Sequence, residues 1–177
     1  MDIIRDKQLS NEEKTLIAMG AAMGAGCRTC ADKLYAIAVS LNIPKAEMLK
    51  AFLLGLDAKA AAVRTMQEKV SALMADGNVG NTKELPAKLA SLIRMASFTA
   101  ANSAPDCLAE TKQAVSNGIT TNQVQLCLAT AKMVRKNAMA FSDQEISDKF
   151  GFAEADVQGA CCPVSANAKS TSGCSCG

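Results

Sequence analysis

The chain has 177 residues and a formal net charge of +2, and 49% of its residues are apolar but only 3% aromatic. This size fits one domain or a tight pair of half-domains, and a core of aliphatic and methionine side chains favours helices over β-sandwiches. The small net charge excludes a nucleic-acid-binding surface, and the lack of histidine excludes histidine-dependent triads and zinc hydrolysis.

Three helices are predicted in the first half of the chain. Ser10 and Glu13 form a capping box that opens the first helix. The second starts at Cys27 or Arg28 and ends before Pro44. The third follows Pro44 and continues to the turn-rich stretch ADGNVGNT. Its apolar residues recur at helical spacing: Met48, Phe52, Leu56, Val63, Met66, Val70 and Leu73.

The second half of the chain repeats the first in a gapless alignment that pairs Leu16 with Leu92, which we call the repeat alignment. We interpret this similarity as a tandem duplication of a helical unit, and the alternative is two similar amphipathic patterns in an Ala-rich chain. Within residues 16–43, the other identical pairs are Ile17 and Ile93, Met19 and Met95, Ala25 and Ala101, Ala38 and Ala114, Val39 and Val115, Ser40 and Ser116, and Ile43 and Ile119.

These patterns predict an all-α fold made of two tandem half-repeats, residues 1–80 and 81–152, followed by a flexible Cys-rich tail, residues 153–177. A last short helix is signalled by a second capping box, Ser142 and Glu145. The first residues lack an apolar signal segment, and no apolar run reaches the roughly 20 residues that span a bilayer. We therefore expect a cytoplasmic protein that does not enter membranes.

The sequence GAGCRTC places Cys27 and Cys30 where one helix ends and the next begins. At this spacing the two sulfurs face the same way, near the partly positive start of a helix, which stabilises a thiolate. In a reducing compartment such a pair is typical of reversible disulfide chemistry. Half of a four-ligand metal site and a pair of inert thiols are the alternatives.

The segment KTLIAMGAAMGAGCRTCADKLYAIAVSLNIPKAEMLKA resembles the all-α carboxymuconolactone decarboxylase and alkylhydroperoxidase D-like (AhpD-like) superfamily. In that family a Gly-Cys-x-x-Cys motif opens a buried helix and a turn of the Asn-Ile-Pro type follows. The resemblance implies a homo-oligomer, often a trimer or hexamer, whose Cys27 and Cys30 act as a redox-active pair. It also implies peroxidase activity, with a dithiol of the lipoyl or thioredoxin type as reductant.

The chain departs from the family at two proton-relay positions. Where peroxidatic members carry a glutamate and a histidine, this sequence has Thr15 and Leu34, and neither side chain moves a proton. Glu12 lies one turn before Thr15 and is a candidate to approach the same face. Lys33 is a candidate cation that lowers the pKa of a thiol, although a solvated lysine is the simpler interpretation.

In the second repeat, Ser103, Asp106 and Glu110 replace Cys27, Cys30 and Leu34. The simpler expectation is that these carboxylates lie on a solvated face. The sharper hypothesis is that Glu110 or Asp106 reaches across the repeat axis as the missing base. Cys127 lies among apolar residues and is expected to be a buried, inert thiol.

The tail carries Cys161, Cys162, Cys174 and Cys176. Four thiols without histidine form a soft ligand set, suited to arsenite, mercury or copper and less well to zinc, because adjacent cysteines rarely serve one tetrahedral site. The tail is also long enough to reach Cys27 as a redox arm. The remaining alternative is a disordered tail without a function.

The leading functional hypothesis is a thiol-disulfide oxidoreductase that reduces small peroxide or disulfide substrates with Cys27 and Cys30 as catalytic residues. Its redox site needs no cofactor. The alternative is a protein that sequesters soft metals or metalloids with its tail cysteines, and a degenerate assembly subunit is a third possibility.

Overall fold

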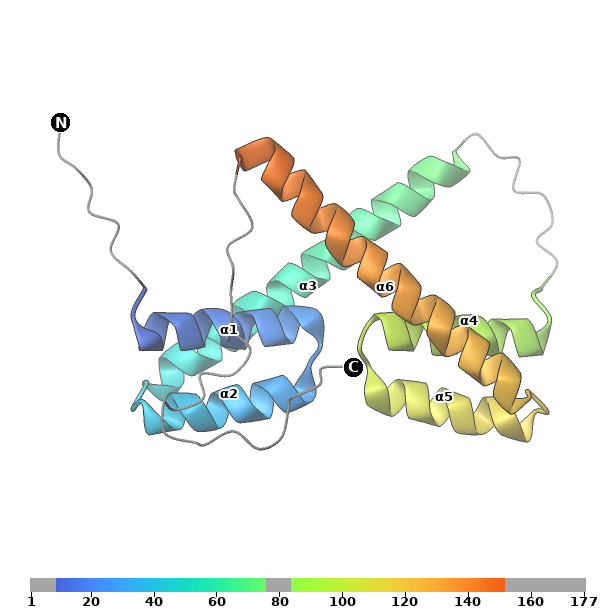
Figure 1. Ribbon diagram of the computed structural model, residues 1–177, viewed down its shortest axis with the longest axis horizontal. Helices are drawn as coiled ribbons and strands as arrows, with labels where there is room; N and C mark the ends of the chain where they lie inside the picture. The colour runs from blue at the N-terminus through green and yellow to red at the C-terminus, as the bar shows by residue number, and fades with distance from the viewer. Residues whose placement is uncertain (1–8, 76–83, 152–177) are drawn as a thin grey trace. The chain divides into compact units, whose positions relative to one another are not determined.

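A computed structural model describes residues 9–75 and 84–151 of the chain. These residues form six helices and no strand, so the predicted all-α class is confirmed (Figure 1). None of the helices in this part of the chain is both long enough and apolar enough to cross a membrane. The helices are α1 (Asn11–Ala25), α2 (Arg28–Ser40), α3 (Lys45–Met74), α4 (Ala87–Ala100), α5 (Ala104–Ser116) and α6 (Thr121–Phe150).

The first helix begins with the capping box that the sequence predicts. Ser10 donates its backbone N–H to the Glu13 carboxylate at 2.7 Å, and Glu13 returns its own N–H to the Ser10 hydroxyl at 3.1 Å. These two bonds satisfy backbone donors that the first helical turn would otherwise leave open. The helix ends at Gly26, whose left-handed conformation (φ 71°) turns the chain toward α2.

The other predicted boundaries in the first half are also confirmed. Cys27 precedes α2, which ends at Ser40, and Asn42 turns the chain with φ 57° before Pro44 starts α3. Proline fits the start of a helix because the first helical turn leaves its N–H groups unpaired in any case. Residues 76–83, which include all but the first residue of the turn-rich stretch after α3, lie outside the described residues.

The first core lies among α1, α2 and α3, with Met19, Ala38 and Met48 almost completely buried. Helices α1 and α3 approach closely where Gly20 and Gly55 face each other. A Cβ atom on Gly55 would overlap the carbonyl oxygen of Gly20 and lie 2.8 Å from the Cβ of Met23. Glycine at position 55 therefore permits the close packing of α1 on α3.

The second core is formed around α4, α5 and the first part of α6, and it contains Met95, Ala114, Ile119 and Val124. The repeat alignment pairs the first and last residues of α2 with those of α5, and those of α3 with those of α6. It also pairs left-handed residues in the connecting turns, Gly26 with Asn102 and Asn42 with Gly118. The two halves thus place helices, turns and buried residues at equivalent sequence positions.

The expected short last helix starting at Ser142 is wrong. Helix α6 runs without interruption from Thr121 to Phe150, so Ser142 lies inside it. No proline or glycine occurs between these ends, so nothing stops the helix before Ser142. The described residues divide into two units between Met139 and Ala140, and the two cores belong to the first.

Candidate functional site

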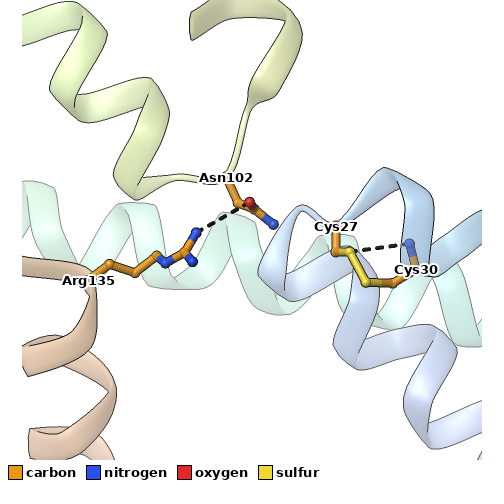
Figure 2. The surroundings of a disulfide bond; sticks show 4 residues. All are labelled: Cys27, Cys30, Asn102 and Arg135. Carbon is orange, nitrogen blue, oxygen red and sulfur yellow. Dashed lines mark hydrogen bonds between the residues drawn. A yellow bond between two sulfur atoms is a disulfide. The ribbon is translucent and has the colours of Figure 1, made fainter. Parts of the chain in front are cut away.

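Cys27 and Cys30 form a disulfide at the start of α2 (Figure 2). Their Cα atoms are 5.2 Å apart, which is within the usual range for a disulfide. Cys27 is the N-cap residue of α2, and its sulfur accepts a hydrogen bond from the backbone N–H of Cys30 at 3.2 Å. The sulfur of Cys27 therefore occupies the place where a helix start favours negative charge.

The turn between α1 and α2 explains this placement. Gly26 takes a left-handed conformation, and the N–H of Cys27 donates to the carbonyl of Ala22 at 2.9 Å. This bond holds Cys27 against the end of α1 while its extended backbone starts α2. Cys27 is half-buried and Cys30 is exposed, so the two residues of the pair differ in exposure.

The two positions where the family carries its proton relay are buried and inert. The Thr15 hydroxyl donates to the carbonyl of Asn11 at 2.8 Å, within its own helix. Leu34 is 7% exposed and belongs to the first core. Neither side chain supplies a proton to the disulfide.

Glu12, one of the candidate supporting residues, lies in the first turn of α1, whereas Cys27 follows its last turn. A helix of 15 residues spans about 22 Å, so the structure does not bring the Glu12 carboxylate to the disulfide. The pKa of Glu12 is lowered by its own backbone N–H and by the Ser10 side chain. Both hydrogen bonds stabilise the ionised carboxylate at the start of α1.

Lys33, the candidate supporting cation, is exposed on α2. Its side chain makes no hydrogen bond or ion pair with another described residue. Lys33 is therefore a solvated lysine, as the simpler of the two interpretations expects.

The expectation that Glu110 lies on a solvated face is wrong, because this residue is only 9% exposed. Its carboxylate accepts hydrogen bonds from the Arg94 guanidinium and from the Ser91 hydroxyl. These bonds, with that of Arg94 the stronger, lower the pKa of Glu110 against the opposing effect of burial. A buried carboxylate is tolerated here because a cation balances its charge and a hydroxyl donates a hydrogen bond to it.

Asp106 is exposed, as expected, and accepts a hydrogen bond from Ser103. All the described partners of Glu110 and Asp106 come from α4, α5 and the turn between them. Sequence reasoning missed Ser91 and Arg94, although the repeat alignment places Ser91 at the position of Thr15. That pairing could have pointed to the site, because Ser91 and Glu110 are a polar pair at the positions equivalent to Thr15 and Leu34.

Two further thiols pack against the second core. The Cys127 thiol donates to the carbonyl of Leu92 at 3.1 Å, and the Cys107 sulfur lies 3.2 Å from the Thr99 hydroxyl oxygen. Cys127 is half-buried rather than fully buried, and burial raises the pKa of its thiol. A raised pKa keeps Cys127 protonated, in line with the unreactive thiol that the sequence indicates.

The tail cysteines, Cys161, Cys162, Cys174 and Cys176, lie outside the described residues. Within residues 9–75 and 84–151, no group of three or more Cys, Asp or Glu side chains is arranged to hold a metal ion. Comparison of the chain with protein-family models, with curated proteins and with solved structures finds no match. The candidate site is therefore interpreted from its own geometry.

Proposed function

We propose that this protein is a thiol-disulfide oxidoreductase in which Cys27 and Cys30 alternate between dithiol and disulfide. The observation that carries the proposal is the disulfide at the N-terminus of α2, between the half-buried residue Cys27 and the exposed residue Cys30. A helix start stabilises the thiolate that forms when the disulfide opens. Cys30 is an exposed residue, and we propose that a reductant approaches the pair from its side.

In the reductive half of the cycle, a thiolate of a small dithiol attacks the sulfur of Cys30. The S–S bond breaks, Cys27 leaves as a thiolate, and a mixed disulfide joins Cys30 to the reductant. The second thiol of the reductant then displaces Cys30, which takes up a proton. Two electrons pass from the dithiol to the protein, and the dithiol becomes a disulfide.

In the oxidative half, the same two electrons pass to the substrate. With a disulfide substrate, a cysteine thiolate forms a mixed disulfide that the second cysteine resolves, and two substrate thiols are released. With a hydroperoxide, the thiolate takes the terminal oxygen and releases an alcohol, after which the second thiol displaces water from the sulfenic acid. Because Thr15 and Leu34 supply no proton, we propose disulfide exchange as the faster reaction.

We also propose a family fold, a cellular location and a role for the tail. The helix bounds and left-handed turns that the repeat alignment pairs support a tandem AhpD-like duplication. A cytoplasmic location would supply the lipoyl or thioredoxin type of dithiol. The tail cysteines would exchange electrons with the Cys27–Cys30 pair.

Self-association is part of the same proposal. Helix α3 exposes Leu56, Val63 and Val70, which lie seven residues apart. It also exposes Met66 and Leu73, which lie about one helical turn after Val63 and Val70, respectively. This is the a and d pattern by which a helix pairs with another of its kind, so we propose a second copy of the chain as its partner. Val70→Glu should lower the mass measured by light scattering while the far-ultraviolet spectrum stays helical.

The main experiment follows turnover of hydroxyethyl disulfide and of tert-butyl hydroperoxide with dihydrolipoamide as the donor. Cys27→Ser and Cys30→Ser should each reduce turnover to background, whereas Cys107→Ser, which alters a cysteine outside the pair, should retain it. Replacing the four tail cysteines by Ser in the full chain should slow turnover without abolishing it. Background turnover by the wild-type protein with both substrates would overturn the proposal, and arsenite binding lost with the tail cysteines would then favour metalloid sequestration.

A further inference from the structure

Two turns of the first compact unit lie against each other beside the disulfide. An ideal Cβ atom on Gly26 would lie 3.0 Å from the carbonyl oxygen of Ala101 and 3.9 Å from that of Asn102. The turn before Cys27 therefore faces the turn between α4 and α5. In the view of Figure 2, Asn102 lies between the Cys27–Cys30 disulfide and Arg135, to which it is hydrogen-bonded.

A lysine that sequence reasoning did not consider approaches the same turn. The ammonium nitrogen of Lys59, on α3, would lie only 2.7 Å from a Cβ atom on Gly26. Lys59 is half-buried, whereas every residue of α3 from position 60 to 74 is exposed. The missing side chain at Gly26 thus leaves room for the ammonium group of Lys59.

The equivalent positions of the second half hold a comparable pair. The repeat alignment pairs Lys59 with Arg135 and Gly26 with Asn102. The Arg135 guanidinium donates to the Asn102 side-chain oxygen at 3.3 Å. Gly26 offers no such oxygen, and Lys59 makes no hydrogen bond or ion pair with any other described residue.

We propose that Lys59 is a positioning residue that stabilises the thiolate of Cys27, which makes Cys27 the attacking and the leaving sulfur of the pair. The inference rests on the proposed redox function. The contact at Gly26 places the Lys59 nitrogen within about 8 Å of the Cys27 Cα atom and within about 11 Å of its sulfur, since consecutive Cα atoms are 3.8 Å apart. Over this distance salt screens a partly buried charge incompletely.

The charged groups nearest these two turns are mostly cations. Arg28 follows Cys27 on α2, Lys59 comes from α3, and Arg135 comes from α6. The first turn of α5 contributes one carboxylate, that of Asp106. The net local charge therefore favours a thiolate.

The other charges near these turns are on exposed residues, and Asp57, two residues before Lys59 on α3, adds one carboxylate. The Asp106 carboxylate is held by the Ser103 hydroxyl. One turn into α2, Asp32 and Lys33 are both exposed and opposite in charge. The last turn of α1 carries no basic residue. Lys59 and Arg135 are the half-buried cations of this set. Arg135 donates to the Asn102 side chain, which leaves Lys59 as the half-buried cation without a described partner.

This assignment gives the two sulfurs different roles. The reductant attacks the exposed Cys30, and Cys27 leaves as the thiolate that Lys59 stabilises, because a thiol of lower pKa leaves faster. In the oxidative half, the Cys27 thiolate attacks the substrate, and the Cys30 thiol resolves the mixed disulfide by displacing the substrate thiolate.

The test measures the pKa of Cys27 in reduced protein from the pH dependence of iodoacetamide alkylation, with Cys27 followed by peptide mapping. Each variant is made in full-length Cys30→Ser protein. Lys59→Met should raise the pKa of Cys27 by about half a unit to one unit, and Lys59→Arg should leave it near its starting value. Lys33→Met is the matched control on α2 and should not change it.

An unchanged pKa in Lys59→Met, with folding verified by thermal unfolding, would overturn the role of Lys59. An equal rise in Lys33→Met would do the same, because it would show a general charge effect. The alkylation assay does not depend on turnover. A pKa rise without wild-type turnover would therefore refute the redox function alone, and turnover without a pKa rise would refute the role of Lys59 alone.

Discussion

The carboxylate of Glu110 is held by the guanidinium of Arg94 through two hydrogen bonds of 3.1 Å, one to each carboxylate oxygen. The Ser91 hydroxyl donates to the same carboxylate from inside the second core. In the repeat alignment, Ser91 is equivalent to Thr15, and the charged Glu110 is equivalent to Leu34. Such bidentate pairs fix geometry more tightly than single contacts do.

The first prediction concerns the coupling between Ser91 and Glu110. Ser91→Ala should lower the free energy of unfolding by about 1–3 kcal/mol, because a buried carboxylate loses a hydrogen-bond donor. In a Glu110→Leu background the same substitution should cost much less, since the carboxylate is gone. Chemical denaturation of the single and double variants measures this coupling. Ser97→Ala, which removes an exposed hydroxyl bonded within its own helix, is the control, and an equal Ser91→Ala cost in both backgrounds would refute the coupling.

A second prediction follows from the titration of Glu110. Its pKa is lowered in the folded chain from an ordinary value of 4.5. The ionised form therefore stabilises the fold above about pH 4.5, and this contribution is lost as the pH falls through the folded-state pKa. The difference in unfolding free energy between wild type and Glu110→Gln should accordingly shrink below pH 4.5. A difference independent of pH would contradict the prediction.

The third prediction tests the close approach of α1 and α3. Gly55→Ala should destabilise the fold by about 1–3 kcal/mol or more, because the new methyl group overlaps the backbone carbonyl of Gly20. Gly24→Ala is the control, since its Cβ atom would meet nothing closer than 3.9 Å and alanine favours a helix by up to about 1 kcal/mol. Thermal or chemical unfolding compares the two. Equal effects would mean that the glycine contact does not limit the packing.

The helix boundaries of the first half were predictable because their signals are local. The capping box of Ser10 and Glu13 and the position of Pro44 each act within one helical turn. The same kind of signal misled at Ser142, where a capping pattern stands inside α6. A capping pattern marks a helix start only where the preceding residues end a helix. Helix α6 contains no proline or glycine that would end it before Ser142.

The site was predictable only in part. The pairing of Cys27 with Cys30 follows from their spacing at the start of a helix. The burial of Glu110 depends on Arg94, which a different helix supplies. The position of Lys59 depends on the approach of α1 to α3 and on the missing side chain at Gly26. Such partners come from tertiary packing, and no local pattern in one sequence reports them.

The last prediction separates the free thiols from the redox pair. In fully reduced protein at mildly alkaline pH, iodoacetamide should modify Cys127 at least about tenfold more slowly than Cys30, because thiolate content and access together set the rate. Burial raises the pKa of Cys127, and its thiol donates to the carbonyl of Leu92, whereas Cys30 is exposed at a helix start. Peptide mapping by mass spectrometry assigns each rate to its cysteine. In the unfolded chain the two rates should converge, and a persistent difference there would show that local sequence, not the fold, protects Cys127.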